Sequence, residues 1–303
     1  MNHALNYQTS MTSSAVTGGL TLRDVEPDDA DACAQICFDA FAAIHDHHCF
    51  PRDFPVLEAA RELMAAWVPH PSIWGVVAEL DGRLVGSNFL DERDPIRSVG
   101  PITIRPYVQQ EGIGRRLMEA VIERGAAAPG IRLTQDAFNM RSLGLYESLG
   151  FVVKEPLGVI AGSPSGDPGA GVEVRPLREA DLDECEALCR RVHGFERTDE
   201  LRDAVHAFRP FVAVREGRIA AYASSVDFWP LNHGVAASDE DMLALLHGAA
   251  AAVEEPIELL VPLRSELFRR CLGVGFRLVK PVNLMARGEY REPRGSWFPS
   301  VLH

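Results

Sequence analysis

The most informative stretch of the sequence is VGPITIRPYVQQEGIGRRLMEAVIERG, residues Val99 to Gly125. It opens with a β-branched run that predicts a strand over 97–105 and closes with an amphipathic run that predicts a helix over 112–125. A strand, a glycine loop and a helix in this order present the free backbone N–H groups of the first helical turn to an anion. Gly112 and Gly114 lack a Cβ, so a diphosphate can approach the main chain closely.

Two arginines follow the second glycine at a place where helices disfavour positive charge. Arg115 and Arg116 fall in the predicted first turn, where the helix dipole costs a cation about 0.3–1 kcal/mol. A bound phosphate reverses the sign of that cost. The alternative is an ordinary turn into a surface helix whose arginines are solvated.

The overall composition excludes several classes of protein. The chain has 303 residues, of which 47% are hydrophobic and 24% charged, the usual balance of globular proteins. A formal net charge of -13 without a run of basic residues disfavours nucleic acid and anionic membranes as partners. No apolar run reaches the roughly 18 residues of a membrane helix, and residues 1–18 read as a polar tail without the features of a signal peptide. We therefore expect a cytoplasmic protein.

Four of the six cysteines form two pairs with one helical turn between the partners. Cys33 and Cys37, and likewise Cys185 and Cys189, lie in amphipathic helical runs. Two such pairs are conceivable zinc ligands, but zinc loops commonly use closer spacing and flanking glycines. The pattern favours reduced thiols buried in a hydrophobic core, without a metal.

An internal duplication accounts for the length of the chain. A Gly/Pro/Ser-rich linker separates two halves in which a first strand, a strand–turn–strand hairpin and a final Gly-Phe step recur. The matching segments are 20–23 with 172–175, 76–86 with 211–221, and 149–151 with 274–276. The predicted division is a tail over 1–18, a first domain over 19–161, a linker over 162–171, a second domain over 172–288 and a C-terminal tail over 289–303.

The order of elements in the first half predicts a mixed sheet. Strands and helices alternate only in its later part, so the sheet should be antiparallel first and parallel later. The predicted strands are 20–26, 73–80, 83–91, 97–105, 131–137 and 151–160, and the predicted helices are 28–44, 55–68, 112–125 and 139–149.

Two motifs in this half resemble signatures of the GNAT superfamily, the GCN5-related N-acetyltransferases. Gln109-x-x-Gly112-x-Gly114 is similar to the family's phosphate-binding loop, and Asn139 through Tyr146 to Phe151 is similar to its helix-to-strand pattern. The resemblance implies an α/β protein with an α+β type of mixed sheet. The implied protein consists of two tandem GNAT-like domains, each a mixed antiparallel and parallel twisted sheet flanked by helices.

The resemblance also implies a site for acetyl-CoA as co-substrate, in a cleft where the fourth and fifth strands of the domain splay apart. The fourth strand would pair with the pantetheine arm, the glycine loop would cradle the pyrophosphate, and the helix after the fifth strand would lie along the CoA arm. The residues implied are Ile102, Thr103, Ile104, Gln109, Gln110, Glu111, Gly112, Ile113, Gly114, Arg115, Asn139 and Ser142.

Tyr146 is implied as the general acid of an acetyl transfer. Attack of an amine on a thioester expels a thiolate, and a phenol of pKa about 10 is a serviceable proton donor for it. Without the motif, Tyr146 would be read as an ordinary residue of an amphipathic helix.

The base that deprotonates the amine is less clearly indicated. The fourth strand carries no carboxylate, unlike that of family members with a glutamate there. The candidates are Asp91, Glu92, Asp136, His45, His47 and His48. The His-rich loop also resembles a metal site through His45, Asp46 and Cys49, but the chemistry needs no metal, and we expect either acceptor contact or a surface loop.

The second half lacks the phosphate loop. The acidic run 239–241 falls where the diphosphate would lie, and Cys271 aligns with the position of Tyr146. The resemblance therefore implies an intact N-terminal copy and a degenerate C-terminal copy that braces the first or closes its acceptor pocket. Phe228 and Trp229 supply aromatic side chains for either role.

These inferences predict an acyltransferase that moves the acetyl group of acetyl-CoA to the amine of a small molecule. Two alternatives remain: a GNAT-fold enzyme that uses another acyl-CoA, or a non-catalytic acyl-CoA-binding sensor or scaffold. The expected partners are a small-molecule amine, with no nucleic acid and no membrane. The chain is expected to be a monomer, as an internal pseudo-dimer, or a homodimer.

Overall fold

The computed structural model describes residues 19–109 and 112–302, and the predicted tail over 1–18 lies outside them. The elements of the first half, with short 3-10 turns omitted, are β1 (Leu20–Asp24), α1 (Ala30–His48), α2 (Leu57–Trp67), β2 (Ile73–Leu80), β3 (Arg83–Asp91), β4 (Arg97–Val99), β5 (Thr103–Ile104), α3 (Ile113–Arg124), β6 (Gly130–Asp136), α4 (Met140–Ser148) and β7 (Val152–Gly162). They follow the order predicted from the sequence.

The predicted strand over 97–105 is broken into two short strands, of which only the first has a partner on both sides. Both pair antiparallel with β3, but β4 also pairs in parallel with β6 at Ser98, whereas β5 does not pair with β6. Pro101 has no N–H to donate at the break. Gly100 fits there because a Cβ at this position would lie 2.5 Å from the Trp67 ring. The break ends the pairing with β6, so the sheet opens between β5 and the last residues of β6.

The second half repeats the plan, with the single strand β11 in place of β4 and β5 and with β14 added at its end. Its elements are β8 (Val172–Pro176), α5 (Leu182–His193), α6 (Thr198–Ala207), β9 (Phe211–Arg215), β10 (Arg218–Ala223), β11 (Gly234–Ala236), α7 (Asp239–Ala250), β12 (Ile257–Pro262), α8 (Glu266–Gly273), β13 (Arg277–Gly288) and β14 (Ser296–Phe298). Within the described part of the chain these strands contribute to two sheets, in the orders β1-β2-β3-β4-β6-β13-β7-β12 and β14-β11-β10-β9-β8, with β5 attached to β3.

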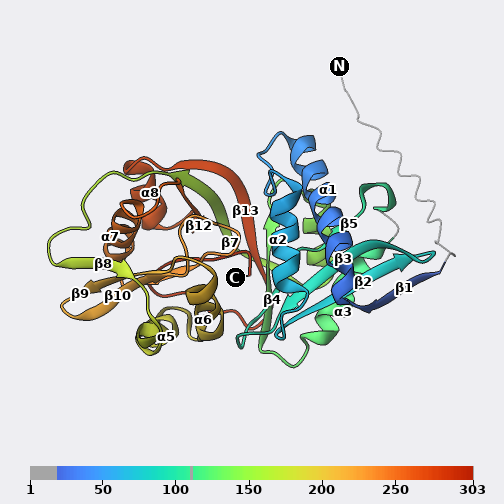
Figure 1. The fold of residues 1–303 in the computed structure, drawn as a ribbon, viewed down its shortest axis with the longest axis horizontal. Helices are drawn as coiled ribbons and strands as arrows, with labels where there is room; N and C mark the ends of the chain where they lie inside the picture. The colour runs from blue at the N-terminus through green and yellow to red at the C-terminus, as the bar shows by residue number, and fades with distance from the viewer. Residues whose placement is uncertain (1–18, 110–111, 303) are drawn as a thin grey trace, which may run out of the picture.

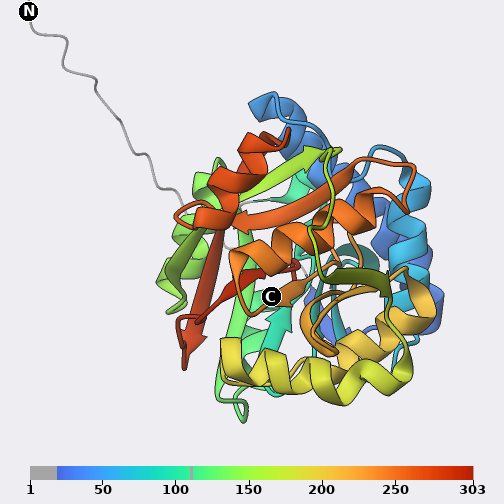
Figure 2. The same ribbon diagram turned by 90° about the vertical axis from the view of Figure 1, so that its left-hand side faces the viewer.

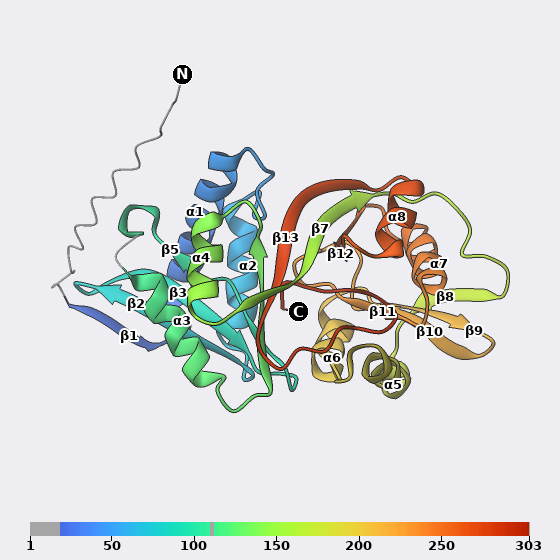
Figure 3. The same cartoon turned by 180° about the vertical axis from the view of Figure 1, so that it is seen from behind.

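The last strands of the two halves are exchanged. β13 of the second half lies between β6 and β7 of the first, and β7 in turn pairs with β12 of the second. Figures 1 and 3 show β7 and β13 bridging the two lobes of the molecule. One sheet therefore passes through both halves, and the predicted boundary at the linker separates the chain but not the sheet.

The C-terminal segment is built into the fold, which corrects its description as a tail over 289–303. β14 pairs with β11, and the side chains of Trp297, Phe298 and Leu302 are buried. Figures 1 and 2 show this dark red segment running into the middle of the molecule. Apolar side chains in 297–302 favour this burial.

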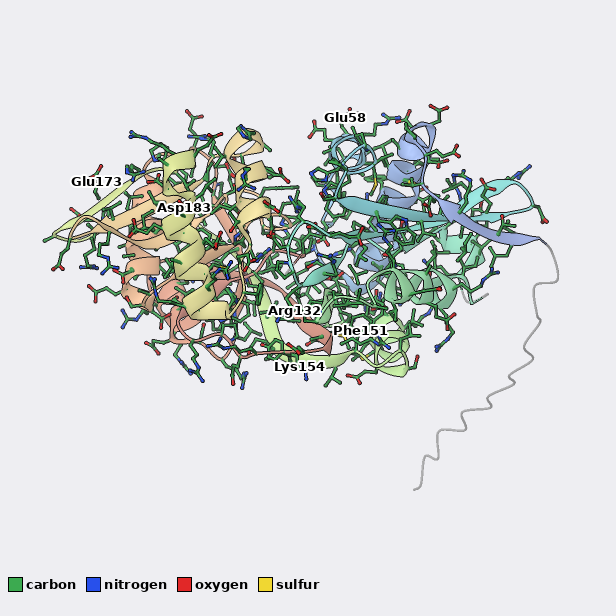
Figure 4. All side chains as sticks on the ribbon, turned by 90° about the horizontal axis from the view of Figure 1, so that it is seen from below. Glu58, Arg132, Phe151, Lys154, Glu173 and Asp183 are labelled. Carbon is green, nitrogen blue, oxygen red and sulfur yellow. The ribbon has the colours of Figure 1, made fainter. Side chains whose placement is uncertain are left out.

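The junction between the halves is buried and contains charge. Arg132 on β6 is 1% exposed, and its guanidinium lies 4.9 Å from the Phe195 ring centroid and 5.1 Å from that of Tyr290. Burial lowers the pKa of Arg132 to about 10. Figure 4 places Arg132 where the lobes meet, whereas Glu58 and Glu173 lie far apart on the outer parts of the molecule.

The paired cysteines are core residues, as the sequence predicts. Cys33 and Cys37 pack in one hydrophobic cluster beneath α1 and α2, and Cys185 and Cys189 pack in another beneath α5. The two pairs therefore belong to separate cores. Among the described helices, none combines the length and the hydropathy needed to cross a bilayer.

Candidate active site

A cavity of about 890 Å³ occupies the opening between β5 and β6. Most of the residues implied by the two motifs line it together: Ile102, Thr103, Ile104, Gln109, Gly112, Gly114, Arg115, Asn139, Ser142 and Tyr146. Ile113 does not line the cavity, because its side chain is 2% exposed and packs in the core of the first half. Gln110 and Glu111 lie outside the described residues.

The backbone of the broken strand faces this cavity. β5 pairs with β3 through Gly86↔Ile104 and Ser87↔Thr103, and among the described strands no other pairs with it. The Thr103 hydroxyl is turned inward, 3.1 Å from that of Ser87. The opposite edge of β5 can therefore pair with an extended ligand such as an amide-containing arm.

The N-terminus of α3 is suited to an anion. Its N-cap is Gly112, with a left-handed backbone (φ 79°) and no side chain to cap the helix. A Cβ at Gly114 would lie 3.1 Å from Ile104 Cδ1, so this position tolerates little added volume. The exposed Arg115 guanidinium donates to Ser148 Oγ at 2.7 Å, and Arg115 is one of the residues that line the cavity. Helix dipole, open backbone and guanidinium together fit a diphosphate.

Asn139 and Ser142 have a structural role that the sequence motif does not reveal. The Asn139 side chain accepts a hydrogen bond from the Ser142 N–H at 3.2 Å and so caps α4. The Gln135 side-chain amide donates to Ser142 Oγ and to the Asn139 carbonyl, at 3.0 and 2.8 Å. This network fixes the start of the helix that carries Tyr146.

Tyr146 lies on the inner face of α4 and is 7% exposed. Its ring meets that of Phe151 edge-on, with 6.3 Å between the centroids. Burial, and secondarily the charge of Asp136, raise the pKa of Tyr146 above its ordinary value. The phenol is therefore protonated at neutral pH but holds its proton more tightly than a free phenol does.

A buried cluster of charged groups lies at the same cavity. Lys280 of β13 is 2% exposed and hydrogen-bonds three groups through Nζ: Asp53 Oδ1 at 2.6 Å, Asp136 Oδ1 at 2.7 Å and His45 Nε2 at 3.1 Å. The ammonium also lies 4.8 Å from the Trp229 ring centroid. Asp53 and Asp136 line the cavity, so the cluster forms part of its wall.

His45 has two hydrogen-bonding states within the cluster. Its Nδ1 lies 2.8 Å from the Phe41 carbonyl and so carries a proton, while its Nε2 lies 3.1 Å from Lys280 Nζ and 3.2 Å from Asp53 Oδ1. The neutral ring accepts from Lys280 through Nε2, whereas the protonated ring donates to Asp53, which raises the pKa of His45 despite its burial. Burial raises the pKa of Asp136, whereas the hydrogen bonds from His45 and Lys280 lower that of Asp53 despite its burial. Asp136 is the carboxylate that accepts a proton more readily.

The structure separates the six candidate bases. Asp136, His47 and His48 line the cavity, and His45 is buried within the cluster. Asp91 is hydrogen-bonded by the Arg93 guanidinium at 2.6 Å, and Glu92 by that of Arg124 at 2.7 Å. Neither Asp91 nor Glu92 lines the cavity.

The metal ligands suggested by the His-rich loop do not come together. Asp46 pairs with Arg52 at the surface, and Cys49 is exposed beyond the end of α1. His45 instead faces Asp53 and Asp136, and one ligand atom from each lies within 4.8 Å of the others. The Lys280 ammonium bonds all three and so occupies the place that a cation would take.

Sequence reasoning missed Lys280 and Asp53. One signal was available for Lys280: it is one of two lysines in a chain that otherwise uses arginine, and arginine cannot replace a compact ammonium with three donors. Its partners are 144 or more positions away in the sequence, so no local pattern links them.

Comparison with known proteins agrees with this geometry. The profile of the Acetyltransferase (GNAT) family matches residues 41–151, which include the broken strand, the glycine loop and Tyr146. Residues 41–151 thus match a GNAT domain. A mycothiol acetyltransferase of Thermomonospora curvata is 33% identical over 141 residues, which is 45% of each chain. The similarity thus spans less than half the length of that relative.

Solved structures extend the GNAT fold to the whole chain. A candidate acetyltransferase from Pyrococcus horikoshii superposes over 100% of this chain and 98% of its own, with a TM-score of 0.72 and 18% identity. A tandem GNAT protein from the clavulanic acid biosynthesis pathway covers 89% of this chain and 98% of its own, with a TM-score of 0.55 and 13% identity. The two-lobed arrangement of GNAT folds is therefore shared with other proteins.

Proposed function

We propose that this protein is an acetyl-CoA-dependent N-acetyltransferase that acts on the amine of a small molecule. The observation that carries the proposal is that one cavity is lined by the open N-terminus of α3, by Tyr146 and by the buried carboxylates Asp53 and Asp136. An anion site, a proton donor and proton acceptors are what the transfer requires.

The co-substrate is proposed to lie along the first half alone. The pyrophosphate meets the N–H groups of 112–114 and the Arg115 guanidinium, and the pantetheine arm pairs with the free edge of 102–104. Asn139 and Ser142 bound this arm from the start of α4. In the second half, the C-terminal strand occupies the corresponding edge, so we propose that residues 172–288 form a degenerate copy without a CoA site.

The proposed chemistry is direct attack. The acceptor ammonium gives one proton to Asp136, and the free amine attacks the thioester carbon. The tetrahedral adduct collapses by breaking the C–S bond, the thiolate takes the Tyr146 proton, and the nitrogen loses its second proton as the amide forms. One of these protons restores Tyr146 and the other leaves to water, so the products are the N-acetylated acceptor, CoA and one proton.

The test is release of free CoA thiol by the full chain, with acetyl-CoA and a panel of primary amines. Amine-dependent thiol release together with a product heavier by one acetyl group supports the proposal. Tight acetyl-CoA binding without turnover of any amine would identify an acyl-CoA sensor instead. Turnover with a different acyl-CoA and none with acetyl-CoA would reassign the donor.

A further inference from the structure

We propose that the cavity has a composite acceptor subsite, built by both halves, for a primary ammonium group carried on an apolar, preferably aromatic, body. Lys280 of the second half is its positioning residue and holds the two carboxylates that meet the ammonium. This inference rests on the proposed acetyl transfer, of which it specifies the substrate class.

The walls of the subsite are apolar and come from both halves. Outside the CoA-binding segments, most of the lining consists of hydrophobic side chains from α1, α2 and the loop between them, from β6 and the loop that follows it, and from the second half. The polar members of this part of the lining are the two carboxylates, His47, His48, Thr134, Gln135 and Arg141. Its aromatic members are Phe41, Phe54, Trp67, Phe138, Phe228 and Trp229. The hydroxyl or additional amine groups of a sugar or polyamine that lie against these aromatic walls would lose hydrogen bonds to water, which costs free energy, whereas an aromatic ring would not.

The two carboxylates suit the subsite to a cationic head group. Asp53 and Asp136 both line the cavity, while Lys280 and His45, which bond them, are buried and do not line it. With His45 neutral and both carboxylates ionised, the cluster carries one more negative than positive charge. An arriving ammonium balances that charge, while an anionic or neutral molecule does not.

Lys280 also fixes where that charge lies. Its three ammonium donors are all used, on Asp53, Asp136 and His45, so it cannot swing into the cavity without breaking them. The strand exchange brings it there, because Val282 pairs with Asp136 in the ladder between β13 and β6. Lys280 thus keeps two like charges side by side and aligned, while the exposed part of each faces the cavity.

The first experiment measures acceptor preference in the wild-type chain. With CoA bound, calorimetry compares 2-phenylethylamine, 2-phenylethanol, glucosamine and spermidine. We expect 2-phenylethylamine to bind at least 10-fold more tightly than each of the others. Preference for glucosamine or spermidine overturns the apolar body, and equal binding of 2-phenylethanol overturns the ammonium site.

Binding and turnover distinguish this inference from the function on which it rests. Acetylation of 2-phenylethylamine in preference to the polar amines supports both. Selective binding without acetyl transfer keeps the subsite and removes the proposed activity. Acetylation of polar amines alone keeps the activity and removes the subsite.

The second experiment tests Lys280 through the pH profile. The groups that face it are Asp53, Asp136 and His45, with Glu258 and Tyr146 close enough to be affected by those carboxylates. Lys280→Met removes the positive charge, so one carboxylate retains a proton to higher pH. We expect the acidic limb of kcat/KM for 2-phenylethylamine to move up by at least one pH unit, and KM to rise at least 10-fold.

Lys154→Met is the matched control, because Lys154 is the other lysine and its Nζ lies over the Tyr290 ring, away from the cavity. Lys154→Met should leave the pH profile and KM unchanged.

If Lys280→Met does not fold, Trp229→Leu provides the second variant. This substitution keeps the charges and removes the aromatic ring of Trp229, and it should reduce selectivity for 2-phenylethylamine over hexylamine at least 5-fold. An unshifted pH limb in folded Lys280→Met, or unchanged selectivity in Trp229→Leu, overturns the corresponding part of the proposal.

Discussion

The two halves of the molecule follow one plan but differ at the edge where the first half opens. In the first half, β5 has β3 on one side and the cavity on the other. In the second half, β14 takes the corresponding side of β11 through the pairs Gly234↔Phe298, Val235↔Trp297 and Ala236↔Ser296. A three-residue strand from the C-terminus is therefore enough to close the opening of a shared fold.

The helices that follow these strands also differ, because the N-terminus of α3 is open and that of α7 is capped by the protein. α3 begins at Gly112 without a side-chain cap, whereas α7 is capped by Ser238, which accepts from the Asp241 N–H. The first turn of α7 also holds three carboxylates, at 239–241, and Asp241 is bonded by Arg215 at 2.8 Å. The helix dipole that can serve a phosphate in one half is satisfied by the protein itself in the other.

The largest expected effect is the loss of CoA binding on Gly114→Glu. A carboxylate at this point of α3 opposes the pyrophosphate and blocks the backbone. Calorimetry should give one acetyl-CoA per wild-type chain and no measurable binding for the variant. Two equivalent sites per wild-type chain would contradict the difference between the halves.

Gly273→Glu is the control for that substitution. Gly273 ends α8 in the second half, is exposed and has open space around the position of a Cβ. Gly273→Glu introduces the same charge as Gly114→Glu and should leave acetyl-CoA binding unchanged. Unchanged affinity in Gly114→Glu would remove the loop from the CoA site.

The next largest effect concerns the strand that closes the second half. Phe298 is 1% exposed, and Phe298→Ala should lower the free energy of unfolding by about 3–5 kcal/mol, as for other buried aromatic residues. Chemical denaturation measures this loss. The stoichiometry of acetyl-CoA should stay at one, because the acidic first turn of α7 remains; a second site would show that β14 alone excludes CoA.

Tyr146→Phe should lower kcat by about 10²-fold, the lower end of the range for general acid catalysis, because water can replace part of the donor. The ring remains, so acetyl-CoA affinity should be nearly unchanged. The counterpart in the second half, Cys271→Ala, should leave kcat unaltered. Steady-state kinetics with an identified acceptor measure kcat of both variants. Full activity in Tyr146→Phe would exclude Tyr146 as the proton donor and leave Asp136 and His45 as the candidates.

The smallest effect is a pH dependence of the contact between the halves. Asp94 accepts from the backbone N–H groups of Asp199 and Glu200, both at 3.2 Å, at the start of α6. Burial, and then the charge of Glu200, raise the pKa of Asp94 from 3.8 to about 7. A carboxyl group with a raised pKa favours folding while it is protonated, so its contribution falls as pH rises from about 4 to about 7.

Asp94→Asn should remove this dependence. The amide keeps an acceptor for α6 but cannot ionise. A shift of one pKa unit corresponds to about 1.4 kcal/mol, and the dipole of α6 offsets part of the cost of the charge. We therefore expect the free energy of unfolding of Asp94→Asn, relative to that of the wild type, to be about 1–2 kcal/mol higher at pH 8 than at pH 4. Denaturation of both proteins at the two pH values measures it; equal slopes with pH would contradict the assignment.

The sequence predicted the elements better than their partners. Hydrophobic periodicity is local, so the helices and strands of the first half were predicted within a few residues. The exchange of β7 and β13 was not, because a strand carries the same pattern whichever strand it pairs with. The break at Gly100-Pro101 had a local signal, a proline within a predicted strand, which indicates an interrupted ladder.

The candidate site likewise has one part that local motifs predict and one part that depends on long-range strand pairing. The residues of the glycine loop and Tyr146 are close in sequence and were predicted from two motifs, and all but Ile113 of those described line the cavity. The charge cluster was not predicted. Its members lie on α1, the following loop, β6 and β13, and only the long-range pairing of β13 with β6 brings Lys280 to Asp136.

The position of β13 has a consequence for synthesis of the chain on the ribosome. β6 and β7 are complete long before β13, and at about 5–20 residues per second the interval is on the order of ten seconds. During this interval the side of β6 that later pairs with β13 is an open sheet edge. Its N–H and C=O groups have no permanent partner, and such edges pair with other chains. A message truncated within the second half should therefore yield an aggregating fragment, and a nascent chain of this design depends on shielding until its last long strand emerges.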